Sequence, residues 1–452
     1  MIQKPWKSFF KGKRVTQLGL GLLGRGVNDA LFLAKHGVEL TVTDKKSAED
    51  LAPSLKKLAR YKNIRFVLSG HHLEDFRNVD FVLKGAGVPL DSPEIAEARK
   101  NAIPIEMDAS LFSKLVPDGV TIVGVTGTRG KSTTAHLIFH ILQTARKSSY
   151  LAGNVRDMAT LPLLEKVRAG DSIVLELDSW QLQGFGDSKL SPQSAIFTTF
   201  MDDHLNYYRS HSIEKSRKMY FADKVNIFRH QKEGDTLIVG EQVVEMIQAA
   251  RPPVAPHVAR PQDIPRDWKI KLIGEHNRMH VSCAIAVTRA LGISDMVIKR
   301  AVASFAGVPG RLEKIRTVAG IQFFNDTTAT TPTATATGIS ALASKKGKHT
   351  VLICGGSDKG LDVAPLIEAI NRGVKAIVFL PGTGTNRLVQ DLGELSIPHT
   401  IVHSMKDAVV SARAFARRSD TVLLSTAFAS FGLFKNEYDR GDQFDREVKK
   451  LK

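Results

Sequence analysis

A glycine-rich segment at residues 127–132 carries the strongest chemical signal in the chain. It runs Gly-Thr-Arg-Gly-Lys-Ser between an apolar run at residues 120–123 and a stretch with apolar residues at helical spacing. A strand, a glycine loop and a helix in this order form a phosphate cradle, in which backbone N–H groups and the helix N-terminus face phosphate oxygens. Lys131 is expected to reach the β- and γ-phosphates, and Ser132 to bind Mg²⁺. We therefore predict an ATP site formed by Gly127, Thr128, Gly130, Lys131, Ser132 and Thr133.

Two further predicted strands of this region end in residues that can bind metal ions. Glu176 follows the apolar run at residues 172–175, and His204 follows Asp203 after the run at residues 195–199. Parallel sheets keep their active sites at the carboxyl ends of their strands. Metal ions and lysine neutralise the negative charge of ATP phosphates, so we expect one Mg²⁺ at Ser132 and a second at Glu176 and His204. A histidine outside this setting would be predicted as a buried, hydrogen-bonded core residue.

The N-terminal region contains a second glycine-rich turn. A strand at residues 14–18 leads into Gly19-Leu20-Gly21-Leu22-Leu23-Gly24, and a helical pattern and a strand at residues 38–43 follow. Asp44 lies 20 residues after Gly24, as in dinucleotide-binding βαβ units. Many related folds use this turn for other phosphates, so the turn alone leaves its ligand open.

The order of these elements predicts an α/β protein of three domains. Alternating strands and helices indicate a Rossmann-like domain at residues 1–115. The glycine loop opens a central P-loop ATPase-like parallel sheet at residues 116–308, in which residues 251–256 form a proline-rich surface excursion. A second Rossmann-like, parallel domain at residues 309–452 is indicated by apolar runs at residues 321–324, 350–354, 376–380 and 421–424.

The composition of the 452-residue chain is that of a folded protein with a basic surface. Hydrophobic residues make up 43% and charged residues 24% of it. No apolar run reaches the ~18 residues that span a bilayer. The first residues lack the apolar core of a secretory signal, and the two cysteines are not spaced for zinc. The net charge of +17 is spread along the chain, which favours a solvated surface over nucleic-acid binding. We expect a cytoplasmic monomer with no membrane insertion and no nucleic-acid partner.

Further segments, taken together with the glycine loop, resemble the Mur ligase family, whose members build the peptide stem of the bacterial cell wall. The order of the segments along nearly the whole chain carries the resemblance more than any one of them. The segments are the loop at residues 124–134, Leu-Ala-Gly-Asn at 151–154, Glu-Leu-Asp-Ser-Trp-Gln-Leu at 176–182, Asp-His-Leu at 203–205, Tyr-Phe-Ala-Asp-Lys-Val-Asn-Ile-Phe at 220–228, Gly-Glu-His-Asn at 274–277, Pro-Gly-Arg-Leu-Glu at 309–313, Asn-Asp at 325–326, Gly-Gly-Ser-Asp-Lys-Gly at 355–360, and Ser-Thr-Ala-Phe-Ala-Ser-Phe at 425–431 with Phe-Lys-Asn at 434–436.

The resemblance implies an ATP-dependent ligase that forms an acyl phosphate and releases ADP. The spacing is most similar to that of the members that add D-glutamate to UDP-N-acetylmuramoyl-L-alanine, a step of peptidoglycan precursor synthesis and thereby of cell-wall biogenesis, cell shape and cell division. The implied catalytic residues are Lys131, Glu176, His204 and Lys224. The resemblance implies that Lys224 is carbamylated, which converts a cation into a carboxylate ligand of the second Mg²⁺. Taken alone, Lys224 would be predicted as a surface lysine.

The resemblance also assigns substrate contacts to each predicted domain. The nucleotide would be held by Asn277, Arg311 and Asp326, and the α-carboxylate of the incoming D-glutamate by Thr330 and Lys359, with Ser430 at its side-chain carboxylate. The UDP-linked substrate would be bound by Gly21, Leu22, Leu23, Gly24, Asp44, Lys45 and Asn154.

Four positions depart from the family pattern. Gly310 stands in place of a histidine, Thr328 of a lysine, His280 of an asparagine and Glu437 of an aromatic residue. Glu437 would repel a side-chain carboxylate unless the contact there is a backbone N–H, so the added amino acid stays open between D-glutamate, L-glutamate and others. Three other functions are alternatives: a folylpolyglutamate synthase-like ligase, which lacks the N-terminal domain; a dinucleotide-dependent oxidoreductase, which gives the glycine loop no role; and a basic P-loop ATPase acting on nucleic acid.

Overall fold

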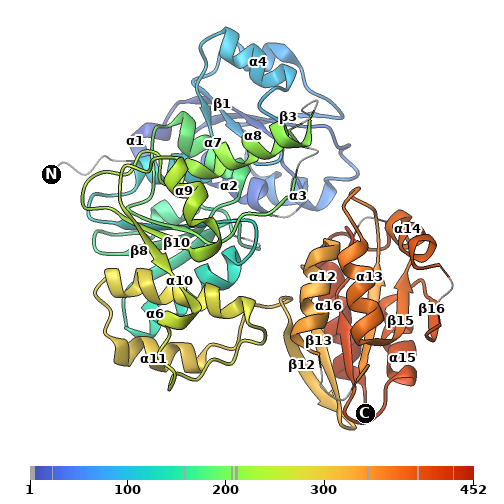
Figure 1. Ribbon diagram of the computed structural model, residues 1–452. Helices are drawn as coiled ribbons and strands as arrows, with labels where there is room; N and C mark the ends of the chain where they lie inside the picture. The colour runs from blue at the N-terminus through green and yellow to red at the C-terminus, as the bar shows by residue number, and fades with distance from the viewer. Residues whose placement is uncertain are drawn as a thin grey trace. The chain divides into compact units, whose positions relative to one another are not determined.

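Three β-sheets with their covering helices make up the part of the chain that the computed structural model describes (Figure 1). This part comprises residues 6–22, 24–156, 158–204, 207–208, 212–343, 347–393, 396–430 and 432–452. The chain divides into two compact units. The first, Met1–Ile270 with Arg278–Phe305, contains two of the sheets, and the second, Lys271–Asn277 with Ala306–Lys452, contains the third.

The N-terminal region forms a five-stranded parallel sheet. Its strands are β1 (Arg14–Leu18), β2 (Glu39–Asp44), β3 (Ile64–Leu68), β4 (Phe81–Lys84) and β5 (Ile105–Glu106), and its helices are α1 (Trp6–Phe10), α2 (Arg25–Lys35), α3 (Ala52–Leu58), the 3₁₀ turn η1 (Leu73–Phe76), α4 (Pro93–Lys100) and α5 (Asp108–Leu115). The strand order is β3-β2-β1-β4-β5. This order places a switch point between β1 and β4, where sheets of this type bind ligands beyond the carboxyl ends of the strands.

The central region forms a six-stranded parallel sheet. Its strands are β6 (Thr121–Thr126), β7 (Ser149–Gly153), β8 (Ser172–Glu176), β9 (Ser194–Phe197), β10 (Thr236–Gly240) and β11 (Pro256–Ala259), and its helices are α6 (Lys131–Thr144), η2 (Leu161–Glu165), α7 (Ser179–Asp187), α8 (Ile213–Val225), η3 (Glu241–Val243), α9 (Val244–Ala249), η4 (Pro261–Asp263), α10 (His276–Ala290) and α11 (Asp295–Ser304). The order is β11-β10-β9-β6-β8-β7. Because β6 lies between β8 and β9, their carboxyl ends are adjacent, as the sequence predicts. Pro256, expected in a surface excursion, instead begins the edge strand β11, a position that tolerates proline.

The C-terminal region forms a six-stranded sheet in which one strand is antiparallel. Its strands are β12 (Glu313–Val318), β13 (Ile321–Asn325), β14 (Thr350–Gly355), β15 (Val374–Leu380), β16 (His399–Ile401) and β17 (Thr421–Leu424), and its helices are α12 (Pro332–Ala341), α13 (Ala364–Gly373), α14 (Thr383–Leu392), α15 (Met405–Phe415) and α16 (Glu437–Lys450). The order is β12-β13-β17-β14-β15-β16. The expectation of a wholly parallel sheet is wrong at β12, because a tight turn at Ala319 and Gly320, both with positive φ, folds β12 back on β13 as a hairpin.

A continuous apolar core explains why the first two sheets belong to one unit. Leu111 and Phe112 of α5 belong to the same buried cluster as Leu182 and Phe185 of α7. The two helices approach closely at Gly184, where a Cβ would lie 2.6 Å from Oγ of Ser110.

The domain boundaries expected at residues 115/116 and 308/309 stay predictions.

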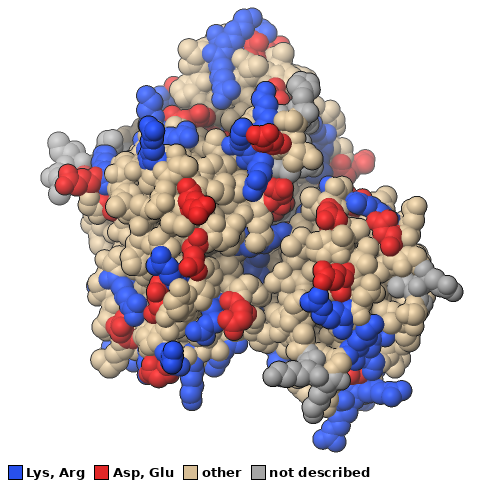
Figure 2. Space-filling model, in the orientation of Figure 1, with Lys and Arg blue, Asp and Glu red and all other residues tan. Residues whose placement is uncertain are grey.

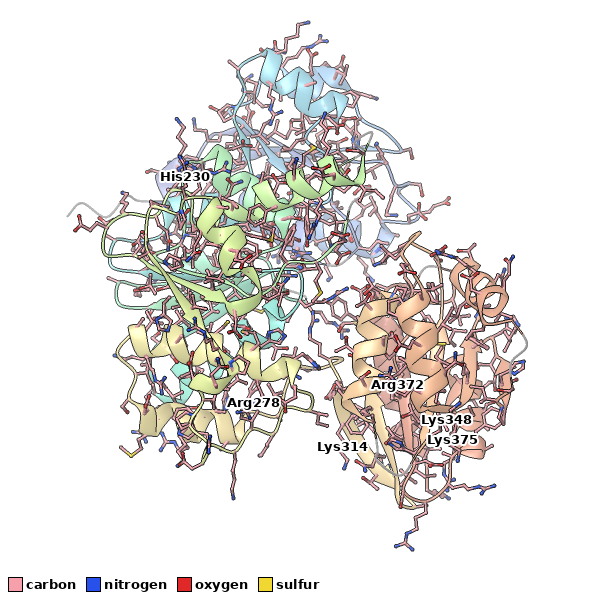
Figure 3. The ribbon with its side chains drawn as sticks, in the orientation of Figure 1. His230, Arg278, Lys314, Lys348, Arg372 and Lys375 are labelled. Carbon is pink, nitrogen blue, oxygen red and sulfur yellow. The ribbon has the colours of Figure 1, made fainter. Side chains whose placement is uncertain are left out.

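The charged surface mixes both signs on the face that Figure 2 shows, where Lys and Arg side chains are interspersed with Asp and Glu. Some of the basic side chains labelled in Figure 3 are neutralised locally: Lys375 on β15 contacts Asp420 at 2.7 Å, and Arg372 on α13 pairs with Glu368. No helix within the described ranges has both the length and the apolar composition to cross a membrane.

Candidate active site

The loop between β6 and α6 has a shape that requires both of its glycines. Gly127 has a φ of +141° and Gly130 a φ of +86°, a region that favours glycine. A Cβ on Gly127 would collide with the Thr198 side chain, and a Cβ on Gly130 with the ring of His280. Gly130 is the N-cap of α6, so the first N–H groups of that helix open into the loop. The loop therefore has the form of the predicted phosphate cradle.

Lys131 and Ser132, in the first turn of α6, both contact neighbouring polar groups. Nζ of Lys131 donates to the carbonyl oxygens of Gly127 at 2.9 Å and Thr128 at 3.0 Å, so the ammonium lies across the loop. Oγ of Ser132 donates to Oε1 of Glu176 at 2.8 Å, and both side chains are buried, as are those of Thr128 and Thr133. A hydroxyl beside a carboxylate supplies the oxygen ligands that Mg²⁺ prefers.

Lys224, near the end of α8, is buried against the same loop. Only 1% of its surface is exposed, which excludes the alternative of a surface lysine. Its Nζ donates to the carbonyl oxygen of Gly127 at 2.9 Å, the oxygen that Lys131 also contacts. Burial and the positive charge of Lys131 hold the pKa of Lys224 well below its ordinary value. Burial and a neighbouring cation therefore both disfavour the charged form of Lys224.

His204 lies beyond the end of β9 in a left-handed conformation, with a φ of +55°. Its Nε2 is 3.7 Å from Oδ2 of Asp203, which is also 3.8 Å from Nη1 of Arg129 in the glycine loop. Its ring centre is 4.8 Å from that of Trp180. Burial lowers the pKa of His204, although the charge of Asp203 opposes this shift. The imidazole is therefore neutral at pH 7, which is the form that binds a metal ion.

The N-terminal glycine turn lines a cavity of about 290 Å³ together with the residues that follow β4. Oδ2 of Asp44 accepts from the backbone N–H groups of Leu20 at 2.8 Å and Gly21 at 3.0 Å, so Asp44 fixes the turn. Gly24 is the N-cap of α2. Leu22 and Lys45 are exposed. Leu23 lies outside the described residues, as do Leu205 and Phe431 of the family-like segments.

Asn154 follows β7 directly. Its backbone N–H donates to the carbonyl oxygen of Glu176 at 2.7 Å. The predicted substrate residue Asn154 and the predicted metal ligand Glu176 therefore belong to adjacent strand ends.

Within the second unit, the predicted amino-acid and nucleotide residues occupy strand ends and loops, except Asn277, which lies in the first turn of α10. Nζ of Lys359 donates to Oγ1 of Thr330 at 3.0 Å, so the pair predicted for the α-carboxylate is brought together. Asp326, at the end of β13, accepts from Oγ of Ser425 at 2.9 Å. Ser430 is buried, Arg311 is exposed, and Nδ2 of Asn277 donates to the carbonyl oxygen of Ile273 at 2.7 Å.

Sequence reasoning missed two buried cations. Lys84 is the last residue of β4 and is 2% exposed. The signal in the sequence is a lysine that directly follows three apolar strand residues, which indicates that its side chain is buried. Arg440 on α16 is 1% exposed and donates to the carbonyl oxygen of Thr327 at 2.7 Å. It fixes the loop that leads to Thr330. Burial lowers the pKa of Arg440 to about 10, which leaves it charged at pH 7.

Two family models match the chain. The Mur ligase middle domain matches residues 125–258, which include the glycine loop, Glu176, His204 and Lys224. A second model, described as "Mur ligase, glutamate ligase domain", matches residues 310–428, which include all six strands of the C-terminal sheet.

Curated relatives match over the full length. The chain is 36% identical to the UDP-N-acetylmuramoylalanine--D-glutamate ligase of Roseiflexus sp., over 97% of this chain and 98% of that protein. It is 31% identical to the ligase of the same name from Geobacillus kaustophilus, over 99% of this chain and 100% of that protein.

Solved structures confirm the predicted fold class. The UDP-N-acetylmuramate-alanine ligase of Thermotoga maritima superposes with a TM-score of 0.62 at 20% identity, covering 97% of this chain and 99% of that chain. The MurF ligase of the same organism, solved in complex with ADP, gives a TM-score of 0.59 at 16% identity, covering 97% and 96%.

Proposed function

The chain belongs to the Mur ligase family, and from this we propose that it is an ATP-dependent ligase that adds D-glutamate to UDP-N-acetylmuramoyl-L-alanine and forms ADP. The reaction would serve peptidoglycan precursor synthesis in the cytoplasm. The observation that carries the proposal is the glycine loop, with Lys131 across it and the Ser132–Glu176 pair beside it.

The chemistry that we propose has two steps. The carboxylate of the L-alanyl group attacks the γ-phosphorus of ATP, which forms an acyl phosphate and releases ADP. The amine of D-glutamate then attacks the acyl carbon, so that a C–N bond forms, phosphate leaves and the amine loses a proton. In the first step two anions must approach each other, and the ammonium of Lys131 and the N–H groups of the loop lower the cost of this approach.

The metal ligands that we propose are oxygen-rich. Ser132 would hold one Mg²⁺ beside the ATP phosphates, and the buried hydroxyl–carboxylate pair that it forms with Glu176 fits such an ion. Within the described residues, no three His, Cys, Asp or Glu side chains gather as a metal site. A second Mg²⁺ would therefore need a ligand besides Glu176 and His204, and a carbamylated Lys224 would supply it as a carboxylate. Bound Mg²⁺ would neutralise the charge that develops between ATP and the substrate.

The surroundings of Lys224 favour the chemical state that carbamylation would require. Carbon dioxide reacts with a neutral amine, and burial and the charge of Lys131 favour the neutral form of Lys224 by lowering its pKa. The reaction joins the amine nitrogen to the carbon of CO₂ and releases one proton. The carbamate would then carry the negative charge that a second metal ion needs.

The amino-acid contacts that we propose lie in the second unit. The Lys359–Thr330 pair presents an ammonium and a hydroxyl to an α-carboxylate, and Ser430 would contact the side-chain carboxylate. Asn277, Arg311 and Asp326 would contact the nucleotide. The UDP-linked substrate would occupy the cavity of the N-terminal glycine turn, with Asn154 also contacting it.

Phosphate release from ATP tests this function. We expect release only when UDP-N-acetylmuramoyl-L-alanine and D-glutamate are both present, with L-glutamate, D-aspartate and meso-diaminopimelate as comparison substrates. Release that is stimulated by DNA or RNA, and not by an amino acid, would overturn the proposal in favour of a nucleic-acid-dependent ATPase. We also propose that the enzyme acts as a monomer, which light scattering during gel filtration would test.

A further inference from the structure

Lys84 is a buried cation whose donors face backbone carbonyls of the N-terminal cavity. Its Nζ donates to the carbonyl oxygens of Val88 at 2.8 Å, Gly85 at 3.3 Å and Ala86 at 3.4 Å. These residues follow β4 and line the cavity together with the glycine turn. An ammonium has three N–H donors and no acceptor, so its charged form matches three carbonyl oxygens.

The carbonyl of Val88 is shared with the region around the catalytic histidine. The hydroxyl of Tyr207 donates to it at 3.1 Å. The ring of Tyr207 lies 5.0 Å from that of Trp180, which lies 4.8 Å from that of His204. The carbonyl oxygen of Val88 therefore connects the cavity to His204 through the side chains of Tyr207 and Trp180.

We propose that Lys84 is a positioning residue for the UDP-linked substrate. Its ammonium holds residues 85–88 in the conformation that binds this substrate. Through the carbonyl of Val88 it also keeps Tyr207 beside Trp180 and His204. The inference deepens the proposed function and rests on it for the identity of the ligand. The hydrogen bonds from Lys84 to residues 85–88 form in the ligand-free protein. Their effect on the order of this segment can therefore be measured without any substrate.

The charge of Lys84 changes close to neutral pH. Burial lowers its pKa to about 8. The carboxylates of Asp178, the N-cap of α7, of Asp187 on α7 and of Asp223 on α8 oppose this shift, and Arg99 on α4 adds to it. Because the pKa is lowered, the ammonium is present below pH 8 and is lost as the pH rises through that value. A neutral amine has two donors and turns a lone pair toward a carbonyl oxygen. Residues 85–88 should therefore loosen above pH 8.

Hydrogen exchange of the ligand-free protein tests the hold directly. The amide of Gly85 donates to the carbonyl oxygen of Leu18 at 2.9 Å and that of Val88 to Gly85 at 3.1 Å, so both should be protected. After correction for the intrinsic pH dependence of exchange, we expect protection of residues 85–88 to fall between pH 7 and 9. In Lys84→Met it should be low at pH 7 and independent of pH. Lys100→Met, at the exposed end of α4, is the control and should behave as the wild type.

Steady-state kinetics test the consequence for the substrate. Hydrogen bonds from a charged donor stabilise the conformation of residues 85–88 that binds the substrate. Losing them in Lys84→Met should raise the KM for the UDP-linked substrate roughly tenfold. The KM for ATP should not change. Tyr207→Phe, which keeps the ring and removes the other donor to Val88, should combine non-additively with Lys84→Met.

Two results separate this inference from the proposed function. Unchanged exchange and an unchanged KM in Lys84→Met would overturn the role of Lys84. A second outcome is that hydrogen exchange of residues 85–88 changes in Lys84→Met as expected, but the wild-type protein turns over no UDP-linked substrate. This outcome would support the role of Lys84 in ordering residues 85–88 and would refute the proposed function.

Discussion

Replacing Lys224 by alanine is the most direct test of how the site works. The nitrogens of Lys224 and Lys131 each lie 2.9 Å from one carbonyl oxygen, so they are at most about 6 Å apart. Two positive charges at that distance repel by roughly 3 kcal/mol at an effective dielectric constant of about 20. This repulsion and the burial of Lys224 both lower its pKa, which favours a neutral or carbamylated form over the ammonium.

If Lys224 acts as a carbamate, Lys224→Ala removes one anionic ligand from the site. Losing one preorganised electrostatic contact lowers kcat by roughly 10²–10³-fold. Acetate should restore part of the rate, because it brings a carboxylate into the vacated space. Lys224→Arg should stay inactive with or without acetate, because its guanidinium is a permanent cation that also fills the space. The rate is measured as phosphate release from ATP in the presence of both co-substrates.

The matched control is Lys218→Ala, which removes an exposed lysine of the same helix that pairs with the exposed Glu214. It should keep the wild-type rate. A readout independent of turnover is the carbamate carbon signal in NMR after incubation with ¹³C-bicarbonate, which should be absent in Lys224→Ala. Full activity of Lys224→Arg, or no carbamate signal in the active wild type, would refute the reasoning.

Three further predictions concern the glycine loop and the amino-acid site. Lys131→Ala should lower kcat by ~10²–10³-fold, because the ammonium across the loop is lost; near-normal turnover would show that the loop does not bind ATP. Gly130→Ala should abolish ATP binding in calorimetry, because its Cβ would meet the ring of His280, whereas Gly170→Ala, with a φ of +92° and nothing within 4 Å, should bind ATP normally. Equal ATP affinities in these two variants would contradict the cradle geometry. Lys359→Ala should raise the KM for D-glutamate roughly ten- to hundredfold with little change for ATP, and equal or better turnover of L-glutamate by the wild type would assign the chain to a different specificity.

The positions of strand ends could be predicted from the sequence because apolar runs bounded by glycine or acids mark them. The ends of β6, β8 and β9, and with them the neighbourhood of the glycine loop and Glu176, follow from such runs. The edge strand β11 could not be predicted in this way, because Pro256 indicates a turn.

The burial of Lys224 could not be predicted from the residues around it. The helix α8 is rich in charged and polar residues, so its pattern gives no sign of which face is covered. Lys224 becomes a buried residue only through the packing of α8 against the loop after β6, which joins segments almost 100 residues apart. For this residue, the family resemblance supplied what the local pattern lacked.

Two of the departures from the family pattern meet in one contact. Gly310 has a φ of +71°. Its carbonyl oxygen accepts two hydrogen bonds from Thr328, one from Oγ1 at 2.9 Å and one from the backbone N–H at 3.2 Å. A histidine at 310 would be strained at this φ, and its Cβ would lie 3.0 Å from Cγ2 of Thr327. A lysine at 328 has no hydroxyl close to its backbone to make the same bond.

Gly310 lies in the segment before β12 and Thr328 in the segment after β13, so the contact couples the two departures structurally. Glu437 contacts the segment after β13 through its backbone carbonyl oxygen, which accepts from Oγ1 of Thr327 at 2.7 Å, a contact that does not depend on the side chain at position 437. The coupled change at Gly310 and Thr328 gives no reason to replace D-glutamate by another amino acid, and turnover of D-glutamate against L-glutamate tests whether the carboxylate of Glu437 does.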